Sequence, residues 1–336
     1  MRNLKINKST AIAELKQNLK SAFHNLEAGA EKDGYLSSPT ENVFHGAREA
    51  IQKGGKFYNM FAAGDGREMD DYIDKQGRLR LAHAKSIFSS SMLAYNFFYW
   101  ISPEQPLTYK GITYNKVYFE VKMKVLEKNQ KGQIIHQPAN MDVVLVSTDC
   151  KTILCIESKF MEHLQNTTSF FPTPYLYPES YYEGNLYRLD FAKLAMTYNY
   201  RGQGYYAGIQ QNIRHLVALS NLKHDKNALA WFKSNNPYME SEILEKINAD
   251  TLFIFTNFLY YPQAYLKDNA AHDILSGSQE YTHLLQNFED DLPDGIKNNH
   301  LPIGIFRNYA DFLSAVKEQM PDGLYNYLSK RYLLKM

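Results

Sequence analysis

The segment NMDVVLVSTDCKTILCIESKF, Asn140 to Phe160, decides the fold of this chain. Two apolar runs flank a short polar turn, and this pattern predicts an antiparallel β-hairpin. If the turn is centred between Asp149 and Cys150, apolar side chains occupy both faces of both strands. Strands that are apolar on both faces are typical of a central sheet covered by helices on each side.

Three charged side chains interrupt the apolar hairpin: Asp142 in its first strand, and Glu157 and Lys159 in its second. With the turn placed as above, Asp142 lies directly opposite Glu157, at a Cβ separation of roughly 4.5–5.5 Å. Lys159 follows Glu157 by two residues and therefore shares its face. The sequence predicts that these three side chains, the charged cluster, meet at the rim of a buried sheet.

The two carboxylates of the charged cluster repel each other by about 3 kcal/mol at an effective dielectric constant of about 20. Lys159 offsets part of this repulsion. Mg²⁺, or Mn²⁺ as its substitute, offsets it better, because Mg²⁺ binds through one or two carboxylates and keeps waters that a phosphate can replace. Two interpretations stay open: a metal site that awaits a substrate oxyanion, and a structural salt-bridge cluster.

Hydrophobic periodicity in the rest of the chain predicts an α/β fold. Residues 1–79 are expected to form an N-terminal appendage of helix and loops, with an amphipathic helix over residues 8–27. Residues 80–336 are expected to form the main domain, a mixed central sheet flanked by helices. Its core order is helix, three strands, helix, strand: Leu81–Ile101, Lys116–Leu126 with one solvated face, the two hairpin strands, Gly208–Leu222 and Thr251–Leu259.

Composition excludes several classes of protein. Lysine and arginine (37) nearly balance aspartate and glutamate (36), so any nucleic-acid surface must be a local patch. No apolar run approaches the ~18 residues of a membrane span, and the N-terminus lacks a signal-peptide core, so a cytoplasmic protein without membrane association is expected. Cys150 and Cys155 have no zinc spacing and are expected to be structural.

Common catalytic motifs are missing from the sequence. It contains no Gly-x-x-x-x-Gly-Lys-Ser/Thr phosphate loop, no His-Glu-x-x-His and no Gly-x-Ser-x-Gly. Chemistry driven by ATP and serine-hydrolase chemistry therefore have no support. The tripeptide Glu-x-Lys is itself uninformative, because it also occurs at Glu14 to Lys16 and at Glu120 to Lys122.

Two polar segments follow the hairpin. Gln211, Arg214 and His215 share one face of the expected helix Gly208–Leu222. This face is either solvated or functional, with Arg214 reaching a phosphate and His215 a neighbour rather than a ligand. The segment from Tyr175 to Tyr206 contains nine of the 26 tyrosines, which either stack on unpaired bases or pack a long surface loop.

Asp142, Glu157 and Lys159 resemble the signature of the PD-(D/E)XK phosphodiesterase superfamily, which has the restriction-endonuclease-like fold. That signature is an aspartate, a spacer and then Glu-x-Lys on the next strand, and Met141 stands where the name of the family has proline. The expected order of elements agrees over about residues 80 to 310. The segments FSSSMLAYNFFYW and IQQNIRHLVAL are similar to a group of bacterial restriction-endonuclease-like proteins, with Met92 where glutamine is expected.

The resemblance implies a metal-dependent endonuclease that hydrolyses DNA phosphodiester bonds, in restriction or related DNA processing. Asp142, Glu157 and the carbonyl of Ser158 would bind Mg²⁺. Lys159 would polarise the attacking water, and Gln211 matches the glutamine that many members place beside the lysine. Cleavage of both DNA strands would favour a homodimer. The alternative is a non-catalytic nucleic-acid-binding or scaffold protein that keeps the fold.

One departure from the family concerns the first helix. Many members carry a glutamate there, and the segment SIFSSSMLAYNFF has none. If this helix contributes to the site, it must do so through Ser90, Ser91 or Asn96. A third carboxylate ligand is therefore left open. The missing glutamate favours the non-catalytic alternative, whereas the intact charged cluster favours an enzyme.

Overall fold

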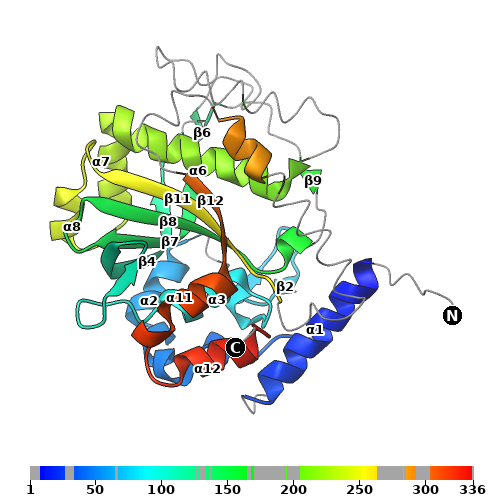
Figure 1. The fold of residues 1–336 in the computed structure, drawn as a ribbon. Helices are drawn as coiled ribbons and strands as arrows, with labels where there is room; N and C mark the ends of the chain where they lie inside the picture. Colours follow the sequence, from blue (N-terminus) through cyan, green and yellow to red (C-terminus); the bar gives the residue numbers. More distant parts are fainter. Residues whose placement is uncertain are drawn as a thin grey trace.

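The structure is a computed structural model of the 336-residue chain. Helices cover both faces of a six-stranded sheet (Figure 1), so the expected mixed sheet with flanking helices is confirmed. The residues that the structure describes are 8–26, 34–64, 67–125, 127–128, 134–135, 138–164, 168–169, 194, 205–262, 283, 285–292 and 303–334.

The sheet combines antiparallel and parallel strands. β3, β4, β7 and β8 pair antiparallel in that order, and β8, β11 and β12 continue the sheet as parallel neighbours. The side chains of residues 143–146 and 153–156 are at most 5% exposed, as expected for central strands covered on both faces. In spatial order the strands are β12 (Ile303–Asn308), β11 (Leu252–Leu259), β8 (Thr152–Lys159), β7 (Ala139–Ser147), β4 (Ile112–Met123) and β3 (Leu107–Tyr109).

Two layers of helices enclose this sheet (Figure 1). On one face, aromatic packing joins the layers, because Phe98 and Phe312 both contact the ring of Phe258 in β11. That face carries α2 (Lys56–Ala62), α3 (Ser90–Phe98), α11 (Tyr309–Val316) and α12 (Leu324–Arg331). The opposite face carries α6 (Ala207–His224) and α7 (Lys226–Asn235), and α7 is followed by α8 (Ser241–Lys246).

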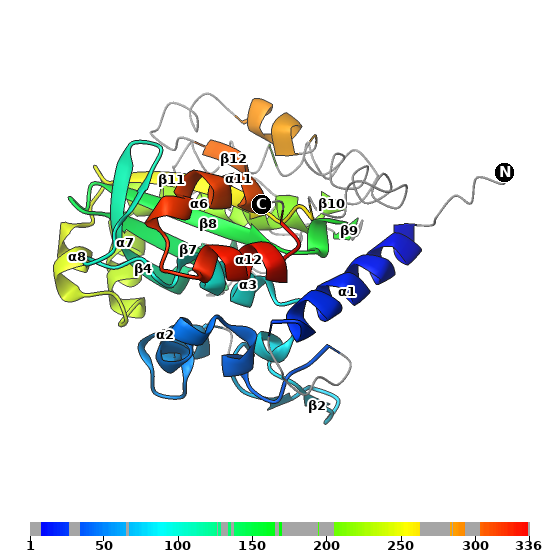
Figure 2. The same cartoon turned by 60° about the horizontal axis from the view of Figure 1, so that its bottom comes forward.

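The N-terminal part of the chain shares the core of the sheet. Helix α1 (Lys8–His24) lies beside α12 (Figure 2), and its Leu15 and Leu19 are buried. These side chains, together with Phe57 and Phe61 of α2, belong to the same continuous apolar cluster as the central strands. In the described part of the chain, three short strand pairs lie outside the main sheet: β1 (Tyr72–Ile73) with β2 (Leu79–Arg80), β5 (Glu127–Lys128) with β6 (Ile134–Ile135), and β9 (Thr168–Ser169) with β10 (Tyr205–Tyr206).

The helix predicted over Leu81–Ile101 is shorter than expected. Helix α3 begins at Ser90, because the hydroxyl of Ser89 accepts a hydrogen bond from Met92 N and caps the first turn. Before this cap the chain forms a short 3-10 helix and an isolated bridge between Ser86 and Tyr35. The apolar residues that precede the cap therefore pack a turn rather than extend the helix.

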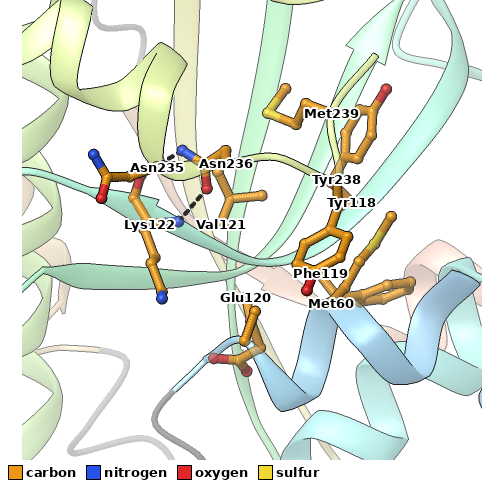
Figure 3. A pocket seen from close by; sticks show the side chains of 11 residues that line it. Met60, Tyr118, Phe119, Glu120, Val121, Lys122, Asn235, Asn236, Tyr238 and Met239 are labelled. Carbon is orange, nitrogen blue, oxygen red and sulfur yellow. Dashed lines mark hydrogen bonds between the residues drawn. The ribbon is translucent and has the colours of Figure 1, made fainter. Parts of the chain in front are cut away.

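The prediction of a solvated face on β4 is wrong at Tyr118. This side chain is 1% exposed, and its hydroxyl donates a hydrogen bond to Glu240. Farther along the strand the side-chain amide of Asn236 accepts from Lys122 N and donates to Lys122 O, each at 2.9 Å (Figure 3). Asn236 thus takes the place of a neighbouring strand and covers the sheet edge.

Candidate active site

The charged cluster lies where β7 and β8 separate. Their ladder ends at Val143 opposite Ile156, in the predicted register, which is therefore confirmed. Continuing that register by one residue places Asp142 opposite Glu157. Here a side chain replaces the ladder, because Ser158 N donates a hydrogen bond to Asp142 Oδ2 at 2.6 Å. The two strands open at the point where the charges begin.

The backbone of Ser158 faces β7. The carbonyl oxygens of Lys151 and Lys159 accept hydrogen bonds from Leu252 N and Tyr260 N, at 2.8 and 2.9 Å. Because backbone groups alternate in direction along a strand, the odd-numbered residues of β8 pair toward β11 and Ser158 is directed the other way. The carbonyl expected as the third metal ligand therefore lies on the side of Asp142.

Glu157 is 1% exposed, and its two carboxylate oxygens have different partners. Lys159 Nζ donates to Oε1, and His215 Nε2 lies 2.9 Å from Oε2. Burial alone would raise the pKa of Glu157, but the charge of Lys159 and the hydrogen bond from His215 hold this pKa below its ordinary value. Glu157 is consequently held as a buried carboxylate ion.

Asp142 has the opposite electrostatic character. Burial and then the negative charge of Glu157 raise the pKa of Asp142 well above its ordinary value, against the opposing charge of Lys159. Asp142 as a whole is nevertheless partly exposed to solvent. Glu157 thus lies close enough to disfavour the ionised form of Asp142, and a bound cation would relieve this repulsion.

Gln211 is the second partner of Lys159. The ammonium Nζ of Lys159 donates to Gln211 Oε1 at 2.7 Å, and the lysine side chain is 12% exposed. The expected contact between Gln211 and Lys159 is therefore present. The carboxylate of Glu157 and the amide oxygen of Gln211 thus both help to hold the ammonium in position.

The interpretation of Gln211, Arg214 and His215 as a solvated face is wrong. Gln211 and Arg214 are half-buried, and His215 is 1% exposed. Arg214 Nη2 lies 3.5 Å from the carbonyl oxygen of Pro138, just before β7. The polar stripe of α6 thus packs against the sheet, and His215, expected to be a neighbour rather than a ligand, bonds directly to Glu157.

Ser90 is the residue of α3 that touches the site. Its carbonyl oxygen accepts a hydrogen bond from Ser158 Oγ at 3.2 Å, so the contact uses its backbone. Asn96 has a structural role instead, because its amide oxygen accepts from Phe44 N and its amide nitrogen donates to three other oxygens. Ser91 is buried. None of these three side chains is shown to supply a metal ligand.

Glu120 lies opposite Asp142 in the strand register, but its backbone conformation directs its carboxylate away from Asp142. It lies between Phe119 and Val121, whose ladder partners flank Asp142. Its φ of 52° is in the left-handed region, which is uncommon for residues with a side chain. The side chain points toward the end of α2 (Figure 3), where a Cβ on Gly64 would lie 3.1 Å from Glu120 Oε2.

Within the described ranges, no three histidine, cysteine, aspartate or glutamate side chains converge as a metal-binding group. The donors available at the charged cluster are the carboxylates of Asp142 and Glu157 and the carbonyl of Ser158. An all-oxygen set with only two carboxylates fits Mg²⁺, which keeps several water ligands, and does not fit metals that prefer imidazole or thiolate.

Asn257 was missed by sequence reasoning. It pairs with Glu157 in the parallel ladder between β8 and β11 and is fully buried. Laterally paired residues project from the same face of a sheet, so its amide lies beside the glutamate. The available signal was a single asparagine inside the apolar strand LFIFTNFL.

Other expectations concern regions away from the charged cluster. Cys150 and Cys155 are buried and free of disulfides. Among the helices of the described residues, none is long and apolar enough to cross a membrane. The tyrosine-rich segment lies outside the described residues, except for Leu194 and the backbone of β10.

Comparison of the chain with known proteins identifies no relative. No protein-family model, no curated protein and no solved structure matches the chain. The geometry of the charged cluster therefore carries the functional argument alone.

Proposed function

We propose that the protein is a metal-dependent endonuclease with a restriction-endonuclease-like core, which hydrolyses phosphodiester bonds in DNA. The observation that supports this proposal most is the meeting of Asp142, Glu157 and Lys159 where β7 and β8 separate. Two carboxylates repel a phosphate group unless a cation lies between the carboxylates and the phosphate. The strand order also agrees, because three antiparallel strands are followed by α6 and the parallel strand β11.

Each residue has a separate role in this proposal. Asp142, Glu157 and the carbonyl of Ser158 hold Mg²⁺, or Mn²⁺ in its place. When bound, the cation supplies stabilisation of the charge that develops on the scissile phosphate. Lys159 orients and polarises the attacking water, and Gln211 holds the ammonium of Lys159 in position. The family resemblance implies a 5′-phosphate product, a role in restriction or related DNA processing, and a homodimer if both strands are cut.

A non-catalytic nucleic-acid-binding or scaffold protein is the competing candidate. The observation that favours it is that both carboxylate oxygens of Glu157 already have partners within the protein, Lys159 and His215. In a purely structural cluster, removal of any member would lower stability, and no divalent cation would bind. Dependence on a cation therefore separates the two candidates.

Purified protein is expected to cleave DNA only with Mg²⁺ or Mn²⁺ present. The substrate should be unmodified genomic DNA from several sources, because a sequence-specific enzyme needs its recognition site. The Lys159→Ala variant should bind Mn²⁺ in calorimetry as the wild type does, yet lose about 10²–10⁴-fold in cleavage rate, the usual contribution of a group that positions a proton transfer.

Two outcomes would count against these assignments. A Lys159→Ala variant that cleaves at the wild-type rate would remove Lys159 from the chemistry. The nuclease proposal as a whole would be abandoned if the protein, with or without DNA, showed no Mg²⁺ or Mn²⁺ binding that depends on Asp142 and Glu157.

Gln211→Ala is expected to slow cleavage while leaving the thermal unfolding temperature nearly unchanged. The amide oxygen accepts a hydrogen bond from Lys159 Nζ, and its loss frees this ammonium, whereas a half-buried side chain contributes little to packing. Gln210→Ala provides the matched control, because Gln210 is also half-buried on α6. A loss of stability without a specific cleavage defect would indicate that Gln211 only packs the helix.

A further inference from the structure

His215 makes a contact with Glu157 that the proposed chemistry does not yet use. Both side chains are 1% exposed, and His215 Nε2 lies 2.9 Å from Glu157 Oε2. A carboxylate ion only accepts hydrogen bonds, so Nε2 carries the hydrogen and donates it. The imidazole ring also lies against Phe255, with 5.7 Å between ring centroids, and this packing limits its rotation.

The spacing of the two elements explains how one helix reaches both charged residues of β8. Residues four apart on an α-helix are separated by about 6 Å along its axis, and residues two apart on a strand by about 6.6 Å. Gln211 meets Lys159, and His215, four residues later, meets Glu157, two residues earlier. Helix α6 therefore runs antiparallel to β8. The distance between Gln211 and His215, about one helical turn, matches the distance between Lys159 and Glu157 along the strand.

A second buried polar group lies beside the same carboxylate. Asn257 pairs with Glu157 across β11 and β8 and is fully buried, and neither of its amide atoms has a hydrogen-bond partner among the described residues. An unpaired buried polar group costs about 1–3 kcal/mol. Polar side chains from α6 and β11 thus enclose Glu157, although an apolar core would favour leucine or phenylalanine at both positions.

We propose that His215 is a positioning residue, which holds Glu157 Oε2 so that the rest of the carboxylate stays directed toward Asp142 and the cation. This inference rests on the nuclease proposal, because it assigns His215 a role through a metal ligand. Asp142 is held in a comparable way, since Ser158 N occupies its Oδ2. Asp142 is thus held by a donor at Oδ2, and Glu157 is held at Oε2 by His215 in addition to the ammonium of Lys159 at Oε1.

A purely structural histidine would also bond to a buried glutamate, so the test must separate cation binding from folding. His215→Phe keeps a ring that packs against Phe255 and removes the donor. His215→Gln keeps an N–H donor at a similar reach, and His215→Asn keeps the amide on a side chain shorter by one carbon. Asn212→Leu is the matched control, because Asn212 is a fully buried polar residue of the same helix whose amide atoms bond to none of the residues that the structure describes.

The measurement is the dissociation constant for Mn²⁺ in calorimetry, made on the full chain together with thermal unfolding. Partners that orient a metal ligand are typically worth about 10–100-fold in metal affinity, so His215→Phe and His215→Asn should weaken Mn²⁺ binding by about that factor. His215→Gln should recover most of the affinity, and Asn212→Leu should retain it. If His215→Phe does not fold, His215→Asn against His215→Gln gives the same comparison.

The outcomes distinguish this inference from the proposal beneath it. Wild-type Mn²⁺ affinity in a folded His215→Phe or His215→Asn variant would overturn the positioning role alone, as would equal weakening in Asn212→Leu. Equal affinities of the His215→Gln and His215→Asn variants would also overturn it, because the reach of the donor would then be irrelevant. Wild-type protein that binds no Mn²⁺ would overturn the nuclease proposal and this inference with it.

Discussion

Replacement of Asp142 or Glu157 by alanine is expected to lower DNA cleavage by at least about 10³-fold. Each change removes one of the two carboxylates that hold the cation, whose charge stabilisation at a phosphate is worth several kcal/mol. Because each ~1.4 kcal/mol corresponds to a factor of ten, several kcal/mol account for a loss of this size. The rates should be measured on genomic DNA with Mn²⁺, together with Mn²⁺ affinity in calorimetry.

Glu120→Ala is the matched control for these two variants. The residue lies opposite Asp142 in the strand register, but its positive φ directs the carboxylate toward α2. Its removal should therefore leave Mn²⁺ affinity and cleavage within the range of the wild type. A large cleavage defect in Glu120→Ala would mean that three carboxylates act at the site, and wild-type cleavage by Asp142→Ala would remove Asp142 from it.

The hairpin and its register could be predicted because the information is local. Two apolar runs of similar length flank one polar turn, and the position of that turn determines which residues pair. The ladder from Val143 to Val146 confirms the predicted pairing. The placement of Asp142 opposite Glu157 then follows from the numbering alone.

Features that depend on distant segments could not be predicted in the same way. Tyr118 is buried because Glu240 and the end of α7 lie over β4, more than 100 residues along the chain. Glu120 leaves the site because of a single positive φ, which no side-chain pattern in the strand indicates. The burial of Tyr118 was therefore set by tertiary packing. The cap at Ser89 is local, and it shortens α3 although apolar residues also precede the cap.

In the candidate site, too, some contacts could be predicted from the sequence and others depend on distant segments. The contact between Gln211 and Lys159 was expected from a resemblance to a known family and is present. His215 was expected on the same face as Gln211, and its contact with Glu157 could also have been predicted, because it follows Gln211 by one helical turn. Asn257 required knowledge that β11 pairs with β8 in parallel, which the order of elements along the chain does not establish.

The second large effect concerns stability without metal. Asp142→Asn should raise, and Glu157→Gln should lower, the thermal unfolding temperature at pH 7 in EDTA. The two carboxylates differ because the pKa of Asp142 is raised by burial and by Glu157, whereas the charge of Lys159 and the bond from His215 bring the pKa of Glu157 below its ordinary value. Breaking a buried ion pair from one side typically costs about 3–5 kcal/mol.

The dependence on pH follows from the same directions. Above the ordinary aspartate pKa the unfolded chain releases the proton of Asp142 and the folded protein retains it, so the stability of the metal-free protein falls as pH rises through that interval. Glu157 has the opposite sign: its contribution is complete above the ordinary glutamate pKa and is lost as pH falls through its lower folded-state pKa. Asp142→Asn should therefore flatten the decline above about pH 4.

Thermal unfolding between pH 4 and pH 8 checks these signs, with EDTA in one series and Mn²⁺ in the other. Mn²⁺ favours ionised Asp142 and should raise the unfolding temperature of the wild type most at the pH values where the metal-free protein is weakened. The Asp142→Asn variant should gain little from Mn²⁺, because it has one ionised ligand fewer. An Asp142→Asn variant that is less stable than the wild type in EDTA at pH 7 would show that Asp142 stabilises the fold as a salt-bridge member, as the scaffold alternative requires.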